Sequence, residues 1–538
     1  MSLRNKIDEE FELTVGDSRY LLIPEKEVLL HFEGEGPALV LVYTTVAGQS
    51  ITKAAIRQFR ANVLDKDDVF RSSFYTNLIF YGGKQHEIEI EPEAFSELAA
   101  WNVQTQSSLA TRAQNSSWTI FALDAPKAGT NGRVIVPSRC YYNPSPSRPF
   151  DGARISVKDN IDIAGHKTTL CNRAWIQLYP EKSKNAACVK KLIEAGAVIV
   201  GKVKLQAMIM REEPLECVEF TAPFNPRADG YQVPSGSSHA SAAGIGSYAW
   251  LDFSLGSDTN GSGRKPASFN GCFSIRPSTG ITNNEGVVAY FRQFDMPVFS
   301  GRDISRFAEF ISVWYGDSPT HRAPGKASVK ILYPSDYLPT PNPAQTQVVD
   351  KFFSGLESAL GINRTEISLA ELWEKHCPDG EQHRDIATYL EFLISLLRNV
   401  GKAISQEECD ECWRRSEIYR HWLLENVFKA DDEDTVTVMI LPIGAGKPNY
   451  RDAELPPNGL LSGYVALNMS PITRAPEVTA PVGDIAYDSI VTEREEPLPV
   501  AVSVIGPPGT DLILVDLVEK GMKGAGLATE VKTGSSMY

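Results

Sequence analysis

Hydrophobic positions in the first 130 residues follow the periods of both strands and helices. An alternating segment covers residues 11–22, apolar runs cover residues 38–43 and 78–81, and a helical period runs from residue 52 to residue 70. Alternation is typical of half-buried strands, whereas a period near 3.6 is typical of an amphipathic helix. The pattern predicts a small α+β unit, in which we find no group of residues that suggests chemistry.

The pattern changes between residues 91 and 149. Residues 91–126 are polar in their middle part, and residues 137–149 are rich in Pro, Ser and Tyr. Such compositions are typical of linkers and domain edges. We therefore predict a domain boundary near residue 130, with a small α+β N-terminal domain at residues 1–130 and a second domain at residues 131–538.

Strand and helix patterns alternate after this boundary. A short strand ends at Lys158, residues 184–195 have helical spacing, and the strand-like AVIVGKV follows Gly196, which suits the end of a helix. Near the C-terminus, LPVAVSVI (residues 498–505) predicts a buried strand and residues 511–522 predict a helix. This order favours an α/β fold in which helices cover both faces of a sheet.

Composition and charge narrow the class of protein. The chain is 42% hydrophobic and 22% charged, as soluble globular proteins are. Its net charge of −14 and its lack of a Lys/Arg stripe argue against binding to nucleic acid. The charged N-terminus lacks the apolar core of a secretory signal, and no apolar run approaches the ~18 residues that span a bilayer. We expect a cytoplasmic protein without a membrane span, whose irregularly spaced cysteines are reduced.

Small and polar residues concentrate in LGSDTNGSGRKPASFNG, residues 255–271. Its glycines allow backbone N–H groups to approach a ligand closely, and Ser262 lies among them. A second segment of this kind, PSGSSHASAA, contains Ser237 and Ser238, and the predicted strand RISVK ends at Lys158. The candidate site consists of these three segments.

A serine hydroxyl needs activation before it can attack a carbonyl group at neutral pH. A Ser-His-Asp hydrolase on an α/β sheet would show G-x-S-x-G, which this sequence lacks. A phosphate-binding loop would need a lysine where Ser262 stands. The third scheme uses Lys158 as a base that burial keeps neutral, with Ser237 as a candidate for an intermediate hydroxyl.

The three segments, in this order, resemble the amidase signature family. The resemblance rests on VKDNID around Lys158, on GSS at residues 236–238 and on GSDTNGSGRKPASFNG. It continues through GAVIVGKV, FNPRADGYQVPSGSS and PLPVAVSVIGPPGTD, and so covers roughly residues 135–525. Within the family, the sequence is most similar to a fungal subgroup described as scytalone dehydratase-like amidases. No dehydratase chemistry follows from that label.

The resemblance implies the amidase signature fold, a large mixed twisted sheet with helices on both faces. It also implies a Ser-cisSer-Lys triad of Ser262, Ser237 and Lys158. Ser262 would attack the carbonyl carbon, and Ser237 would pass its proton to Lys158 and later return it to the leaving amine. Four backbone N–H groups would stabilise the oxyanion, those of Thr259, Asn260, Gly261 and Ser262. Ser238, Asp258 and Arg264 would support the site, which needs neither a metal ion nor an organic cofactor.

Several positions depart from the usual pattern of the family. The interval from Ser237 to Ser262 is one residue longer than usual, so Ser238 is an alternative for the bridging hydroxyl. The other departures border the site and bear on substrate preference and activity: His239, Ala240, Asn260, Gly263 and Lys265. We interpret His239 as a capping or pocket-lining residue, because the lysine scheme leaves it no catalytic role.

The predicted function is hydrolysis of a carboxamide, or of an ester, in a small molecule through an acyl-enzyme. Two alternatives stay open: acyl transfer to an amine or alcohol, and a catalytically silent protein whose N-terminal unit binds a partner. A homodimer is compatible with each of them. Cys409 and Cys412 form a C-x-x-C near His421, but no second pair lies at zinc spacing, so we predict no metal site.

Overall fold

The computed structural model divides the chain into two compact units, Met1–Gly152 and Ala153–Tyr538. In the first unit it describes residues 11–15, 18–29, 41–45, 50–69, 77–81, 88–101, 103–105, 117–122, 134, 136–139 and 142–152. In the second unit it describes residues 153–316, 318, 328–381, 385–390, 405–429, 435–453 and 464–538. The boundary that we predict near residue 130 lies outside the described residues and stays a prediction.

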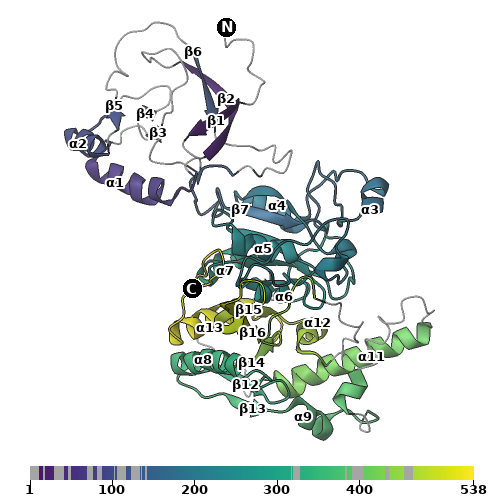
Figure 1. Ribbon diagram of the computed structural model, residues 1–538. Helices are drawn as coiled ribbons and strands as arrows, with labels where there is room; N and C mark the ends of the chain where they lie inside the picture. The colour runs from purple at the N-terminus through teal and green to yellow at the C-terminus, as the bar shows by residue number, and fades with distance from the viewer. Residues whose placement is uncertain are drawn as a thin grey trace. The chain divides into compact units, whose positions relative to one another are not determined.

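The described part of the first unit contains two three-stranded sheets (Figure 1). The antiparallel sheet has the order β1-β2-β6, with β1 at Phe11–Val15, β2 at Ser18–Leu29 and β6 at Ser117–Ala122. The parallel sheet has the order β3-β4-β5, with β3 at Leu41–Thr44, β4 at Asn77–Tyr81 and β5 at Gln104–Thr105. Helices α1 (Lys53–Asn62) and α2 (Pro92–Ala100) lie between the parallel strands in the chain, as parallel connections require.

Helix α1 is shorter than its hydrophobic pattern predicts. It begins at Thr52, whose hydroxyl oxygen accepts a hydrogen bond from the N–H of Ala55 and caps the first turn. The helical period runs to residue 70, but α1 ends at Asn62 and a 3₁₀ turn, η2 (Leu64–Lys66), follows. An apolar period of 3.6 does not separate a helix from the tighter turn that continues it.

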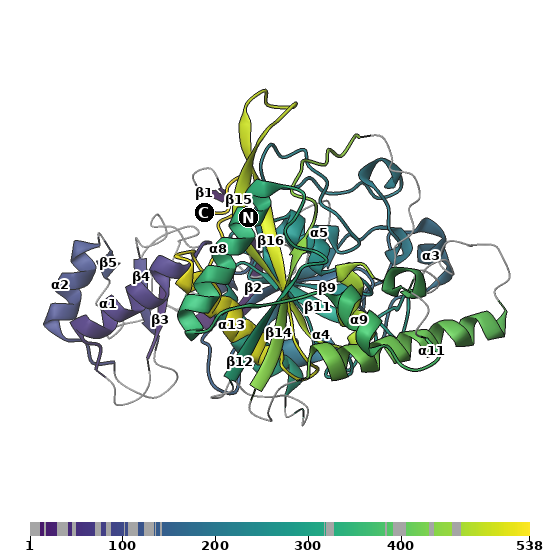
Figure 2. The same ribbon diagram turned by 90° about the horizontal axis from the view of Figure 1, so that it is seen from below.

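A ten-stranded mixed sheet forms the centre of the second unit (Figures 1 and 2). Its order is β13-β12-β14-β16-β15-β10-β11-β9-β7-β8. The strands are β7 (Arg154–Lys158), β8 (Val198–Val203), β9 (Phe253–Asp258), β10 (Phe273–Arg276), β11 (Met296–Gly301), β12 (Ser328–Pro334), β13 (Thr365–Ile367), β14 (Thr435–Ile443), β15 (Glu477–Asp488) and β16 (Glu495–Ile505). Neighbours are parallel at the two ends of the sheet and antiparallel from β9 through β14.

Helices cover both faces of this sheet. The main helices of the second unit are α3 (Arg173–Leu178), α4 (Ala187–Glu194), α5 (His239–Ser247), α6 (Arg264–Phe269), α7 (Phe307–Tyr315), α8 (Pro343–Leu360), α9 (Leu369–His376), α11 (Gln406–Trp422), α12 (Met469–Thr473) and α13 (Asp511–Gly524). Figure 2 shows α8 and α13 on one side of the strands and α5, α9 and α11 on the other. The predicted fold class, a large mixed sheet between helical layers, is confirmed.

Several predicted elements of the second unit are also confirmed. The strand predicted to end at Lys158 is β7, and the helical pattern at residues 184–195 contains α4. The predicted strand at residues 498–505 lies within β16, and the predicted helix at residues 511–522 lies within α13. Burial agrees with the pattern, because every residue of β7 is buried, as expected for a strand covered on both faces.

The sheet brings distant polar residues to one edge. Strands β7 and β9 are parallel, so their last residues, Lys158 and Asp258, lie at the same edge. Strand β11 runs antiparallel to β9, so Asp295, just before β11, also lies there. The same alternation places Arg276, the end of β10, and Glu477, the start of β15, at this edge. The candidate site is built along it.

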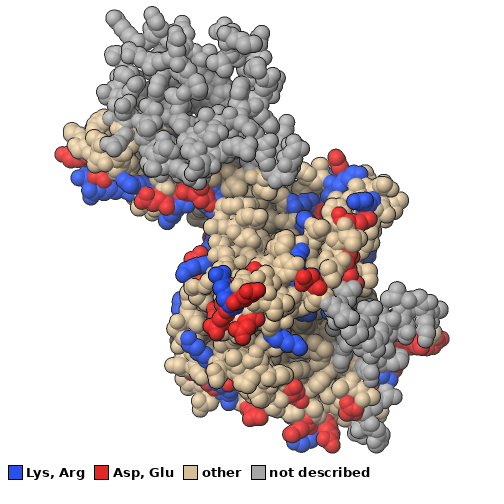
Figure 3. Space-filling model, viewed as in Figure 1, with Lys and Arg blue, Asp and Glu red and all other residues tan. Residues whose placement is uncertain are grey.

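Two further features are the mixture of charges on the surface and the length of the helices. Figure 3 shows Lys and Arg side chains scattered among Asp and Glu on the visible face of the second unit. Within the described parts of the chain, no helix combines the length and the apolar composition needed to cross a bilayer.

Candidate active site

Lys158 is a fully buried lysine surrounded by serines. Its Nζ donates to the Oγ atoms of Ser237, Ser238 and Ser257, each at 2.8 Å, and lies 3.4 Å from the carbonyl oxygen of Ser257. Burial lowers the pKa of Lys158 to about 7, although the carboxylates of Asp258 and Asp295 act in the opposite direction. A lysine with this pKa is unprotonated in a large fraction of molecules at neutral pH, so it can accept a proton.

The hydrogen bonds distinguish the two serines that compete for the bridging role. A hydroxyl group has one proton to donate. Ser238 Oγ donates its proton to the carbonyl oxygen of Ser257 at 3.0 Å and accepts from the N–H of Ser257 at 3.2 Å. Ser237 Oγ contacts Lys158 and no other hydrogen-bonding group in the described residues. The hydroxyl proton of Ser237 is therefore the one free to move, and the Gly236–Ser237 peptide bond that presents it is cis.

Ser262 lies in the loop between β9 and α6. Its side chain is partly exposed, and its hydroxyl has no partner within the described residues. Its carbonyl oxygen accepts a hydrogen bond of 3.0 Å from the N–H of Ser238, which joins this loop to the Ser237–Ser238 segment. Gly261 precedes it with φ at +127°, and a Cβ atom there would lie 3.2 Å from Leu467. The loop therefore needs glycine at this position.

The backbone N–H groups of this loop do not all point to free space. The N–H of Gly261 donates to Asp258 Oδ1 at 2.9 Å, so it is occupied. In the described chain, the N–H groups of Thr259, Asn260 and Ser262 have no acceptor. These three donors remain available for an oxyanion, and Gly261, which we also predicted, is engaged by Asp258.

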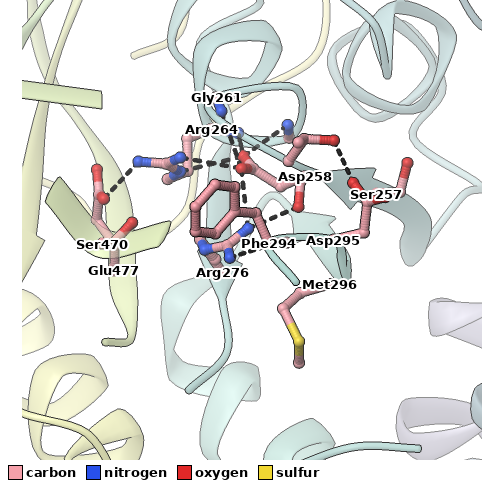
Figure 4. A network of polar contacts seen from close by, with 12 residues as sticks. Ser257, Asp258, Gly261, Arg264, Arg276, Phe294, Asp295, Met296, Ser470 and Glu477 are labelled. Carbon is pink, nitrogen blue, oxygen red and sulfur yellow. Dashed lines mark hydrogen bonds and ion pairs between the residues drawn. The ribbon is translucent and has the colours of Figure 1, made fainter. Parts of the chain in front are cut away.

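Asp258 is the centre of a buried polar network (Figure 4). Arg264 and Arg276 both form ion pairs with it, at 2.9 Å and 3.1 Å, and Arg264 extends the network to Glu477 at 2.5 Å. Burial raises the pKa of Asp258, but the two guanidinium groups outweigh it and hold this pKa well below the ordinary value. The N–H of Gly263 also donates to the carboxylate. Asp258 therefore holds the loop in place, and its role as a supporting residue of the site stays a prediction.

Four residues of this arrangement were not among the predicted site residues. Ser257 binds Lys158 directly, and Asn160 Nδ2 donates to Ser257 Oγ at 3.2 Å. Arg276 and Glu477 complete the network around Asp258. Ser257 and Asn160 lie inside the motifs, so their polar side chains were a usable signal. The other two reach the site only through the order of strands in the sheet, which no local pattern reveals.

Four other residues were noted in the sequence: His239, Lys265, Cys409 and Cys412. His239 is fully buried, and neither ring nitrogen has a partner in the described structure. Burial, with the nearby Lys158, lowers its pKa to about 3, so the imidazole is neutral. Lys265 Nζ lies 5.6 Å from the ring of Phe269. Cys409 and Cys412 both lie on α11, and neither forms a disulfide bond within the described residues.

The segment that contains the candidate site is similar to known proteins. The model of the Amidase family matches residues 137–341, which contain all three motifs. "Amidase 1" of Oryza sativa subsp. japonica is 34% identical over 170 residues, which cover 32% of this chain and 38% of that protein. A glutamyl-tRNA(Gln) amidotransferase subunit of Treponema denticola is 32% identical over 247 residues, covering 42% of this chain and 49% of the relative. These matches support the resemblance of this chain to the amidase signature family.

Solved structures with a similar fold are also known. The urea amidolyase of K. lactis superposes with a TM-score of 0.55 at 20% sequence identity, and the match covers 70% of this chain and 23% of that one. At this identity the likeness concerns the fold alone. The chain spans less than half the length of the two curated relatives described above.

Proposed function

We propose that this protein cleaves a carboxamide bond through an acyl-enzyme on Ser262. The main support for this proposal is the pair formed by Lys158 and Ser237. Lys158 is buried and its pKa is lowered to about 7, and the Oγ of Ser237, whose proton is free, lies 2.8 Å from its Nζ. The match to the Amidase family and to relatives named as amidase and amidotransferase supports amide chemistry. Esters are a second substrate class for the same site, because the same groups serve acyl transfer from either.

In the proposed reaction, neutral Lys158 takes the hydroxyl proton of Ser237 while Ser237 takes that of Ser262. The Ser262 oxygen attacks the carbonyl carbon, and the oxyanion accepts hydrogen bonds from the N–H groups of Thr259, Asn260 and Ser262. When the carbon–nitrogen bond breaks, Ser237 gives a proton to the leaving amine and recovers one from Lys158. Water then repeats the sequence at the ester, which releases the acid and frees Ser262.

The direct test is turnover of the full chain. A panel of small carboxamides and the matching esters is incubated with the protein, and release of ammonia or alcohol is measured. The Ser262→Ala variant should lose turnover by at least ~10³-fold, since nucleophilic catalysis disappears. Ser312→Ala, an exposed serine on α7, is the matched control and should keep the parent rate. Turnover that survives in Ser262→Ala would contradict the proposal.

Added hydroxylamine distinguishes hydrolysis from acyl transfer. If water resolves the acyl-enzyme, the acid forms without added nucleophile and hydroxamate forms only in competition with it. If an amine or alcohol is the natural acceptor, product appears only when an acceptor is present. A protein that reacts with neither substrate nor a fluorophosphonate would be catalytically silent.

Three more specific predictions rest on the sequence alone. They are membership of the fungal subgroup, a cytoplasmic location and assembly as a homodimer. The prediction that the first unit takes no part in the chemistry also rests on the sequence, because none of the three motifs lies in it.

A further inference from the structure

Asp295 lies at the same sheet edge as Lys158 and Asp258, just before β11. Its side chain is buried, with 5% of the residue exposed. The hydroxyl of Thr259 donates to Oδ1, and the N–H of Phe291 donates to Oδ2. Both donors are uncharged, and the described residues provide no ion pair for this carboxylate. Asp258 differs, because it has two arginines.

We infer that Asp295 is a positioning residue of the proposed amidase site, which holds Thr259 in the oxyanion loop and places an unpaired negative charge near Lys158. The inference rests on the proposed function. It adds a residue that lies outside all three motifs and 36 positions after Thr259 in the chain.

Two aspartates hold the loop that begins at Thr259. Asp258 holds its far end through the N–H groups of Gly261 and Gly263. Asp295 holds its near end through the Thr259 hydroxyl. The N–H of Thr259 itself has no acceptor in the described chain, so the side-chain bond orients a free donor. Figure 4 shows Asp258 and Asp295 beside Ser257. An oxyanion hole works when its donors are fixed before the reaction, so losing this bond should slow acylation.

Nearby charges determine how readily Lys158 accepts a proton. The groups that act on Lys158 come from four segments: Asp258 at the end of β9, Asp295 before β11, His239 on α5, and Cys171 after β7. His239 is neutral, and burial raises the pKa of the Cys171 thiol to about 11, so it is neutral as well.

The two carboxylates differ in how far their charge is compensated. Arg264 and Arg276 offset the charge of Asp258. Asp295 faces Arg276 and Lys158 without an ion pair to either. Burial raises the pKa of Asp295 above its ordinary value, whereas the bonds from Thr259 and Phe291 favour the charged form. Of the two carboxylates, Asp258 raises the pKa of Lys158 more, and Asp295 adds to this effect without an ion pair of its own within the described residues.

The test compares Asp295→Asn with the parent in full-length protein. Asparagine keeps the shape but removes the charge, so the pKa of Lys158 should fall. The second-order rate of labelling by an ethyl fluorophosphonate is measured from pH 5 to pH 9. The midpoint of the acid limb, which reports the neutral lysine, should move down by about 0.5–1 pH unit. The plateau should fall by up to about 10-fold, because asparagine has one acceptor oxygen, whereas Thr259 and Phe291 donate to different oxygens of the Asp295 carboxylate. Asp488→Asn, on the exposed end of β15, should change neither value.

A second variant separates the two parts. Thr259→Val removes the hydroxyl but keeps the carboxyl group of Asp295, so its plateau should fall about 10-fold while its midpoint moves less than that of Asp295→Asn. It also keeps the inference testable if Asp295→Asn does not fold. A parent-like plateau in Thr259→Val, or a parent-like midpoint and plateau in folded Asp295→Asn, would overturn the inference and leave the proposed function intact. Parent protein that no fluorophosphonate labels would instead refute the proposed function itself.

Discussion

Replacing Lys158 by methionine should change how stability depends on pH. In the unfolded chain the lysine has its ordinary pKa near ~10.4, whereas in the folded protein burial lowers its pKa to about 7. Between these values the unfolded chain carries a proton that the folded protein lacks. Raising the pH through this window therefore favours the folded state, and below pH 7, where both states hold the proton, the effect vanishes. The variant has no such group.

The size of the effect follows from these two pKa values. One proton contributes about 1.4 kcal/mol per pH unit where it is bound only in the unfolded state. Because the folded lysine is still about half protonated at pH 7, the gain from pH 7 to pH 9 is about 2 kcal/mol. Methionine also removes three hydrogen bonds to serines. The part of that loss that does not depend on protonation cancels when the two pH values are compared, and the part that does is already contained in the two pKa values.

The assay is urea unfolding of the full-length parent and of Lys158→Met at pH 7, 8 and 9, followed by tryptophan fluorescence. The free energy of unfolding of the parent minus that of the variant should rise by about 2 kcal/mol from pH 7 to pH 9. Lys190→Met, which removes an exposed lysine on α4, is the control, and its difference from the parent should stay constant. A constant difference for Lys158→Met would show that burial does not lower the pKa of Lys158. Lys158 could then not serve as the base of the mechanism.

Two further outcomes are expected. Ser237→Ala should lose fluorophosphonate labelling by at least ~10²-fold, whereas Ser238→Ala should lose less, since the Ser238 proton is already donated to Ser257; equal losses would contradict this ranking. Lowering the pH should destabilise His239→Leu less than the parent. Below pH ~6.5 the imidazole of the unfolded parent binds a proton, whereas that of the folded parent, with a pKa of about 3, stays neutral. Urea unfolding should show their stability difference shifting by about 2 kcal/mol between pH 7 and pH 5; an unchanged difference would refute the buried neutral imidazole.

The sequence was sufficient for the fold class and for the local elements around the motifs. Strand β7 and helix α13 were predictable because their apolar residues follow one period without interruption. The contacts of Asp295 and Glu477 were not predictable, because they depend on the order β15-β10-β11-β9-β7. That order brings together strands that lie far apart in the chain, and hydrophobic periodicity carries no information about which strands are neighbours.

The candidate site divides in the same way. Lys158, Ser237 and Ser262 could be proposed from motif residues, and their catalytic roles stay predictions. The preference for Ser237 over Ser238 came from hydrogen bonds, since two adjacent serines look alike in a sequence. The engagement of the Gly261 N–H by Asp258 is likewise a matter of loop conformation.

The central claim is that Ser262 is the nucleophile and Lys158 its base. The most direct measurement labels the full-length parent and Lys158→Met with a fluorophosphonate, follows the rate, and maps the modified residue by peptide mass spectrometry. We predict a single label on Ser262 and a rate at least ~10²-fold lower in folded Lys158→Met. A label on Ser237 or Ser238, or labelling of Lys158→Met at the parent rate, would contradict it.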